Sequence, residues 1–320
     1  PPRSTLDRSS AASDVYKRQL VMSIAEVQVE AEIETFADKD PWYSVALDLI
    51  KRKPLGAAGA FIVLIMIFMA VFAELIAPFD PELNNYEFML VGPDWTFLLG
   101  TDQFGRDIFS RIVYGARTAL FVGFVSAFVG SAIGLVLGVT SAYFRGKFDL
   151  VFQRVMDVFM SFPLIILALA VVSIFGTGTQ NVILAITIPF IPRCARVVRS
   201  NALAVREIPY IDAARACGYS HTRIILKHMV PNVMAPYLIM FTAFVGQAIL
   251  LEASLSYLGL GVQEPVPAWG LMLQGGAEEF AESAPWIPIF PGVAISLAVF
   301  GFNLFGDAVR DVLDPKLRSR

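Results

Sequence analysis

The chain has 320 residues, of which 56% are apolar and 17% charged, and its mean hydropathy is +0.63. Soluble domains have roughly a quarter of their residues charged and just under half apolar, so this composition excludes an ordinary soluble enzyme, a disordered chain and a collagen. The net charge of −3 offers no basic surface for nucleic acid, and two cysteines are too few for a disulfide scaffold. Length and hydropathy together predict a polytopic membrane protein.

The first 21 residues are polar and precede the first methionine, Met22. They have neither apolar periodicity nor a continuous apolar core, which excludes a secretory signal peptide. We therefore expect residues 1–21 to be a leader that is not part of the native protein, with a genuine disordered tail as the alternative.

Apolar stretches long enough to cross a bilayer follow in chain order. Crossing a hydrocarbon core of about 30 Å takes about 20 residues of helix. Five stretches meet this length, and a sixth is marginal because its apolar part, from about Asn181, ends near Ile191 where arginines begin. We count it as a span whose helix continues into water. The predicted spans are residues 55–77, 118–144, 150–175, a stretch from about 181, 233–260 and 286–305.

Lysine and arginine are distributed unevenly between the loops that connect these spans. Membrane proteins concentrate both residues in their cytoplasmic loops. Sixteen lie before the first span, in the loops after the second and fourth, and after the sixth; the three on the other side are Arg106, Arg111 and Arg117. This ratio predicts that both termini, residues 22–54 and the tail 311–320, are cytoplasmic.

The extracytoplasmic loop of residues 78–117 is predicted to end in an amphipathic helix. One helical face is apolar, and Asp107 and Arg111 form an i,i+4 pair on another face. We expect a short helix on the outer membrane surface before the second span. Its apolar face consists of Ile108, Phe109, Ile112 and Val113.

The second span carries small residues at helical spacing. Gly130, Gly134 and Gly138 form one stripe, and Gly123 begins a second stripe on a neighbouring face. Small residues let helix backbones approach closely inside a bilayer, where lipid is as apolar as leucine. The second span is therefore predicted to pack within protein.

The loop between the fourth and fifth spans, residues 201–232, predicts two short helices that meet at a glycine corner. Pro209 suits a first helical position and Gly218 suits the left-handed position that ends a helix. Ser220 can cap the next helix, for which we expect a stop before Pro231. Because the first helix is short and rich in alanine, we interpret it as a docking element for another protein.

This loop resembles the EAA loop of ABC importer permeases, whose pattern is E-A-A, three residues, G, nine residues and I-x-L-P. The chain has Asp212-Ala213-Ala214, Gly218, His228, Val230 and Pro231 at those positions. It departs from the pattern at Asp for Glu, His for Ile and Val for Leu. Aspartate keeps the negative charge of glutamate, so we expect the docking geometry to be retained.

Further segments resemble the dipeptide, oligopeptide and nickel importer subfamily. They are LIAPFDP at the end of the first span, the stretch 99–117 (LGTDQFGRDIFSRIVYGAR), the stretch 252–273 (EASLSYLGLGVQEPVPAWGLML) and His228–Asn232. The resemblance covers about residues 51–315 and includes several motifs in the same order. The chain looks like the C-type permease of such a transporter.

The resemblance implies an all-α protein with six transmembrane helices, the type I ABC importer permease fold and a core domain of residues 118–310, in a bacterial or archaeal plasma membrane. It implies a homologous second permease, two ATPase subunits or domains that bind ATP and Mg, and an extracytoplasmic solute-binding protein as partners. The EAA loop would couple the permease to the ATPase. Its expected coupling residues are Pro209, Tyr210, Asp212, Ala213, Ala214, Arg215, Gly218 and Pro231.

The sequence offers no catalytic residue and no cofactor site. The single Gly-Lys pair, Gly146-Lys147, has Ser141 where a P-loop needs its first glycine, so ATP hydrolysis is expected in another chain. The two histidines, His221 and His228, lack the cysteine or carboxylate partners of a metal site. We expect them to serve helix packing or docking instead.

Ionisable residues at membrane depth are costly and therefore informative. Glu74, Arg154 and Asp307 lie near predicted span ends, whereas Asp157 and Glu252 are expected deeper, either lining a pore or paired with a neighbouring helix. An ion-coupled secondary transporter that uses these carboxylates is the alternative function, but it would predict an internal repeat that the sequence does not show. Peptide, nickel, glycoside and opine all stay open as substrates.

Overall fold

The structure is a computed structural model that describes residues 53–277 and 279–313. These residues are helical apart from their connecting loops and one isolated β-bridge. The expected leader 1–21 lies outside the described residues, as do most of the segment 22–54 and most of the tail 311–320.

Five helices in the described residues are long and apolar enough to cross a membrane, or six if one bent pair counts as a single span. This confirms the predicted class of all-α polytopic membrane protein. The elements in chain order are α3 (Pro54–Val71), α4 (Ala73–Ile76), η1 (Tyr86–Phe88), α5 (Ile108–Phe144), α6 (Gly146–Met160), α7 (Leu164–Phe175), α8 (Thr179–Arg206), α9 (Pro209–Ala216), α10 (His221–Ile224), η2 (Ile225–Met229), η3 (Val230–Val233), α11 (Met234–Tyr257), α12 (Trp269–Ala277) and α13 (Trp286–Leu313).

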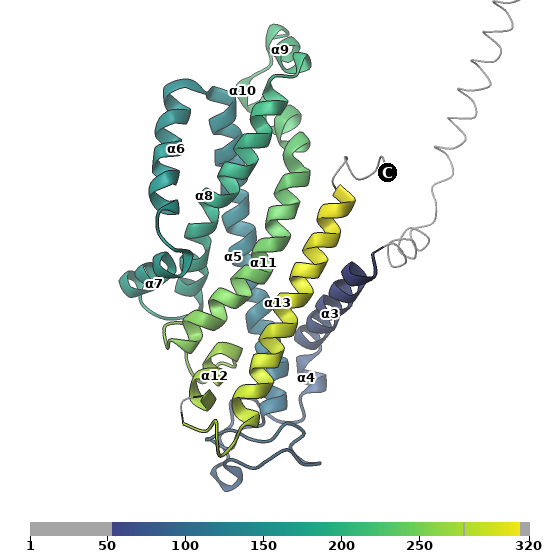
Figure 1. Cartoon of the computed structure of the whole chain (residues 1–320), viewed down its shortest axis with the longest axis vertical. Helices are drawn as coiled ribbons and strands as arrows, with labels where there is room; N and C mark the ends of the chain where they lie inside the picture. Colours follow the sequence, from purple (N-terminus) through teal and green to yellow (C-terminus); the bar gives the residue numbers. More distant parts are fainter. Residues whose placement is uncertain (1–52, 278, 314–320) are drawn as a thin grey trace, which may run out of the picture. The chain divides into compact units, whose positions relative to one another are not determined.

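The long helices pack side by side around α5. Helix α5 contacts α8 and α11 along its length, and α13 packs against α3, α11 and α12. Figure 1 shows α9 and α10 at one end of this bundle and α4 and α12 at the opposite end. The two ends are therefore built from different elements.

The glycine stripe of α5 packs against α8, which confirms that this span is enclosed by protein. A Cβ atom on Gly134 would lie 2.6 Å from Cys194 Cβ, and one on Gly138 would lie 2.6 Å from the carbonyl oxygen of Ala195. Helix α8 thus approaches α5 at a distance that only glycine permits. On the neighbouring face, a Cβ on Gly123 would meet Ile249 of α11 at 2.8 Å.

The expected surface helix before the second span is not separate from it. Helix α5 begins at Ile108 and continues without a break to Phe144. Ile108 and Val113 are fully buried inside the protein. The prediction was wrong because the apolar face packs on the chain's own helices instead of on lipid. The expected Asp107–Arg111 pair is also replaced, since Asp107 caps the helix by accepting a 2.8 Å bond from the Ser110 amide.

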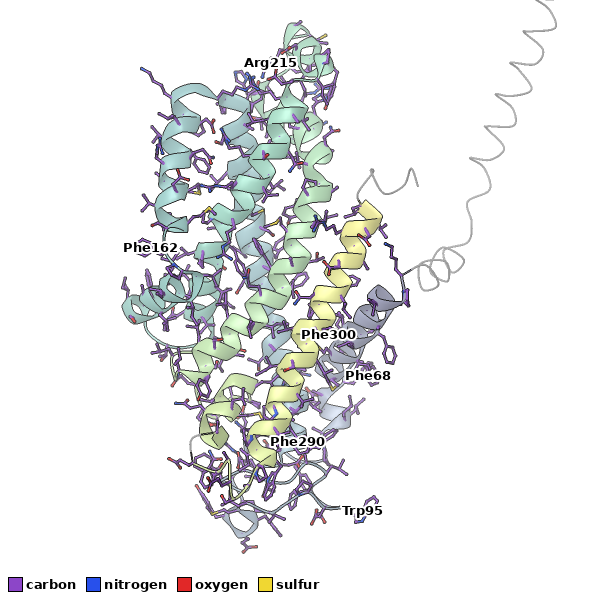
Figure 2. The ribbon with its side chains drawn as sticks, in the orientation of Figure 1. Phe68, Trp95, Phe162, Arg215, Phe290 and Phe300 are labelled. Atoms are coloured by element: carbon purple, nitrogen blue, oxygen red, sulfur yellow. The ribbon has the colours of Figure 1, made fainter. Side chains whose placement is uncertain are left out.

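The third predicted span, 150–175, is broken into α6 and α7, which meet at 89°. The break contains Pro163, which lacks the amide hydrogen needed to continue a helix. Figure 2 shows Phe162 at this corner. Hydropathy correctly identified an apolar stretch long enough to cross a membrane. It did not show that this stretch forms two helices with a sharp bend between them.

The second helix of the 201–232 loop does not stop before Pro231. The chain continues from α10 through the π-helical turn η2 and the 3-10 turn η3 into α11. Pro231 lies in the first turn of η3, where its missing amide hydrogen costs nothing. The proline therefore changes the helix type instead of ending the helix.

Candidate functional site

Helix α9 projects from one end of the bundle and is bounded as the sequence predicts. Pro209 occupies the first helical turn. Gly218 has φ of +76°, a left-handed conformation that favours glycine, and follows the end of the helix. The Ser220 hydroxyl accepts a 3.3 Å bond from the Arg223 amide and so caps α10. These signals turn the chain sharply between α9 and α10.

Only part of the alanine-rich face of α9 is open to solvent. Asp212, Ala213 and Ala216 are exposed. Ile211 is fully buried, and Ala214 is only 7% exposed because it packs against the protein's core. On this face of α9, the surface available to a partner protein is therefore the ridge of Asp212, Ala213 and Ala216.

Tyr210 ties α9 to the turns that precede α11. Its hydroxyl donates to the carbonyl oxygen of His228 over 2.8 Å, and the Asn232 side-chain amide donates to the same hydroxyl over 2.9 Å. The Tyr219 ring stacks on His228 with 5.8 Å between ring centroids. Pro231 is exposed beside this group. The histidine thus contributes to packing, and among the described residues no cluster of potential metal ligands occurs.

A second group joins α9 and α10 to the end of α5 and centres on Tyr143, which the sequence did not single out. The Tyr143 hydroxyl and His221 Nδ1 are 2.6 Å apart. The Arg215 guanidinium lies 4.9 Å from the Tyr143 ring centroid, and Arg206 Nε donates to the Tyr143 carbonyl over 2.9 Å. Arg215 also pairs with Asp212 at 3.3 Å. We call Tyr143, Arg206, Arg215 and His221 the Tyr143 junction. Figure 2 shows Arg215 at this end of the bundle.

The two carboxylates expected at membrane depth have different surroundings. Glu252 is 1% exposed and accepts a 2.7 Å bond from the Ser256 hydroxyl one turn along α11. Asp157 of α6 is partly exposed and pairs with Arg196 of α8 and with Arg154. Glu252 is therefore enclosed by this chain's own helices, while Asp157 belongs to a surface ion pair.

A polar seam holds α6 against α8. Beside the Asp157–Arg196 pair, Asp149 accepts a 2.6 Å bond from Arg199 Nε. Gln153 lies between the two aspartates and donates to the Ser141 hydroxyl over 3.4 Å. Helix α6 is thus attached through charged and polar groups, whereas α5 and α8 are packed through glycines.

At the opposite end of the bundle, two of the family-like motifs meet in an ion cluster formed by the buried Asp102, Arg106 and Arg111 and the half-exposed Glu264. Arg106 binds Asp102 at 2.7 Å and Glu264 at 2.6 Å. Arg111 is 1% exposed, donates to the Pro81 carbonyl over 2.8 Å and lies 3.6 Å from Glu264. Burial opposes the charged form of Arg106, but its bonds to Glu264 and Asp102 hold its pKa above the usual value. The cluster joins the start of α5 to the loop after α11.

The family model described as "Binding-protein-dependent transport system inner membrane component" matches residues 130–319. A second model, "N-terminal TM domain of oligopeptide transport permease C", matches residues 41–93. The two matches together cover the first span and the chain from the second half of α5 onwards.

Several curated relatives are similar over nearly the whole chain. The dipeptide transport system permease protein of Alkalihalophilus pseudofirmus is 42% identical over 279 residues, which is 87% of this chain and 91% of the relative. The glutathione transport system permease protein of Pectobacterium atrosepticum is 41% identical over 282 residues, 88% of this chain and 93% of the relative.

A solved structure supports the fold. The inward-facing MetNI methionine ABC transporter contains a chain that matches with a TM-score of 0.53 at 22% identity, over 65% of this chain and 98% of that chain. At this identity the likeness concerns the fold alone. The chain therefore belongs to the family of binding-protein-dependent transport system inner membrane components, as a C-type permease subunit of an ABC importer and not an enzyme.

Proposed function

We propose that this permease forms half of a translocation path for short peptides. Its relatives at 40–42% identity are named for dipeptide, peptide and glutathione transport, and glutathione is itself a tripeptide. A homologous second permease would complete the path, and an extracytoplasmic binding protein would deliver the peptide. ATP and Mg would be bound by two ATPase subunits.

We further propose that α9 docks one of those ATPase subunits. The observation that carries this proposal is the exposed ridge of Asp212, Ala213 and Ala216, which is presented between Pro209 and Gly218 at the tip of the bundle. Small side chains allow a helix to enter a groove on another protein. The aspartate adds one negative charge that a basic groove wall can recognise.

The surroundings of the two carboxylates weaken the ion-coupled alternative. A carboxylate that carries protons or sodium needs access to a path, but Glu252 is enclosed and accepts from Ser256. Asp157 is paired with two arginines. Neither group has the free, path-facing geometry that such a mechanism requires.

Enlarging the ridge tests the docking proposal. We expect Ala213→Trp to insert in the membrane but to release the ATPase and abolish peptide uptake, because an indole at that position would block close approach. Gly218→Val should do the same, since a β-branched residue is strained at positive φ and would redirect α9. The measurement is recovery of the ATPase subunits with tagged permease.

Ala281→Trp is the matched control, because Ala281 is exposed near the opposite end of the bundle. It should retain the ATPase fully. Full ATPase recovery with Ala213→Trp, together with normal uptake, would contradict the docking role of α9.

A further inference from the structure

Tyr143, the centre of the Tyr143 junction, is buried and is not part of the exposed docking ridge. Tyr143 is 3% exposed, whereas Ala213 and Ala216 of the ridge are exposed. An ATPase seated on α9 would therefore touch the ridge and not the tyrosine. Any part that Tyr143 plays in transport must act through its neighbours in this chain.

Three elements converge on this one side chain. Arg206 from the end of α8, Arg215 from α9 and His221 from α10 each contact Tyr143. The tyrosine lies in the last turn of α5, and its ring also faces the His221 imidazole with 5.5 Å between centroids. These contacts connect α9 and α10 directly to the end of α5.

Two routes lead from α9 along the bundle, and they differ in stiffness. One route runs through η2 and η3 into α11, and these π and 3-10 turns are places where helices bend readily. The other route enters α5, which is an uninterrupted helix of 37 residues. At about 1.5 Å per residue, α5 reaches about 55 Å.

The far end of α5 is also held by specific contacts. Asp107 caps its first turn, and Arg111 holds the first turns inside the ion cluster with Asp102 and Glu264. Because the helix has no internal break, it connects Tyr143 to the opposite end of the bundle without a flexible joint. The route into α11 lacks this property because the irregular turns η2 and η3 precede that helix.

We propose that Tyr143 is a positioning residue that transmits the displacement of α9 into α5, and so links ATP hydrolysis in the partner to the opening of the permease. The proposal rests on the proposed function of α9 as the ATPase contact. Tyr143 holds His221 through its hydroxyl and Arg215 through its ring. Docking and transmission are therefore carried by different residues and can be separated by substitution.

The test uses the complete complex of permeases and ATPases in lipid nanodiscs and proteoliposomes. Tyr143→Phe keeps the ring beneath Arg215 and removes only the bond to His221. We expect full ATPase recovery and an unchanged unfolding temperature, but at least about a fivefold fall in peptide transported per ATP hydrolysed, the lower end of measured couplings between sites. His221→Leu should give a similar loss. The double variant should be no worse than either single one, because both remove the same contact.

Tyr114→Phe is the control, since Tyr114 lies on the same helix near its other end and also has an arginine, Arg117, 5.4 Å from its ring centroid. It should transport normally. A normal ratio of transport to hydrolysis in Tyr143→Phe would overturn the proposal, as would an equal loss in Tyr114→Phe. Loss of the ATPase from Tyr143→Phe would also overturn it, by making the tyrosine part of docking. Failure of the docking role of α9 would instead appear as full ATPase recovery and normal uptake with Ala213→Trp.

Discussion

At the residue scale, the side chains that hold this permease together are mostly those whose partners lie far away in the sequence. Arg106 and Glu264 are separated by 158 positions yet form a 2.6 Å ion pair. Tyr143 and His221 are 78 positions apart. The motifs around these residues could be recognised in the sequence, but which residues they contact could not, since pairing of this kind depends on how the helices pack.

Glu264 provides a prediction at this scale. Its carboxylate is the half-exposed member of the ion cluster, and without it Arg106 and Arg111 would face Asp102 alone. We expect Glu264→Gln to lower the free energy of unfolding by about 1–2 kcal/mol, within the range for a charged hydrogen bond to a buried partner and reduced because the glutamate is partly solvated. Thermal unfolding of the purified permease measures this loss of stability.

Glu87→Gln is the control, because Glu87 is an exposed glutamate at the same end of the bundle, in the loop before α5 that also carries Asp102 and Arg106. It should leave the unfolding temperature unchanged. An equal effect of the two substitutions would show that loss of negative charge at this end, and not the cluster, sets the stability.

At the element scale, the sequence predicted the turn between α9 and α10 correctly, but not which face of α9 is buried or where the next helix ends. Pro209, Gly218 and Ser220 bound α9 and α10 as predicted, because each acts through its own backbone. Ala214 was expected on the docking face but lies inside, because a helix as short as α9 can turn either face toward the bundle. The sequence could not show whether Pro231 ends a helix, because a proline can either end one helical turn or begin the next, depending on the residues that follow.

The same limit applies to the long helices. Hydropathy located the first, second, fourth, fifth and sixth spans, yet it could not show that α5 extends back to Ile108 or that the third span bends by 89° at the break that contains Pro163. An apolar face packs equally well on lipid and on protein, so sequence alone does not distinguish a surface helix from a buried one. Whether the helix is buried depends on what it packs against, and that is decided by the tertiary structure.

The α5–α8 contact makes an element-scale prediction. A Cβ on Gly134 would lie 2.6 Å from Cys194 Cβ and 2.9 Å from the Ile191 carbonyl oxygen, so Gly134→Val must push the helices apart. Overpacking of this kind typically costs about 1–3 kcal/mol. We expect a lower unfolding temperature and reduced yield of folded permease.

Val136→Ile is the matched control on the same helix, because Val136 is 57% exposed and faces away from α8. It adds apolar volume without meeting the neighbouring helix. If both variants unfold at the temperature of the unsubstituted protein, the close approach at Gly134 does not contribute to stability.

At the scale of the whole molecule, the two ends of the bundle differ in chemistry. The end with α9 is rich in arginine, including Arg206, Arg215 and Arg223, and it holds the exposed thiol of Cys217. At the other end, Arg106 and Arg111 are buried in the ion cluster. Because positively charged loops remain in the cytoplasm, this asymmetry predicts the orientation of the permease in its membrane.

Thiol labelling of cells that lack the ATPase subunits tests this orientation, and the native chain already carries the reporter. Cys217 is exposed on the α9 side, whereas Cys194 is buried. A membrane-impermeant maleimide should therefore leave the unsubstituted permease unlabelled in intact spheroplasts and label it after permeabilisation. Leu83→Cys adds an exposed thiol in the loop at the opposite end and should be labelled in both conditions. Labelling of Cys217 in intact spheroplasts would place α9 outside the cell, where it could not reach an ATPase, and would contradict both the orientation and the docking role.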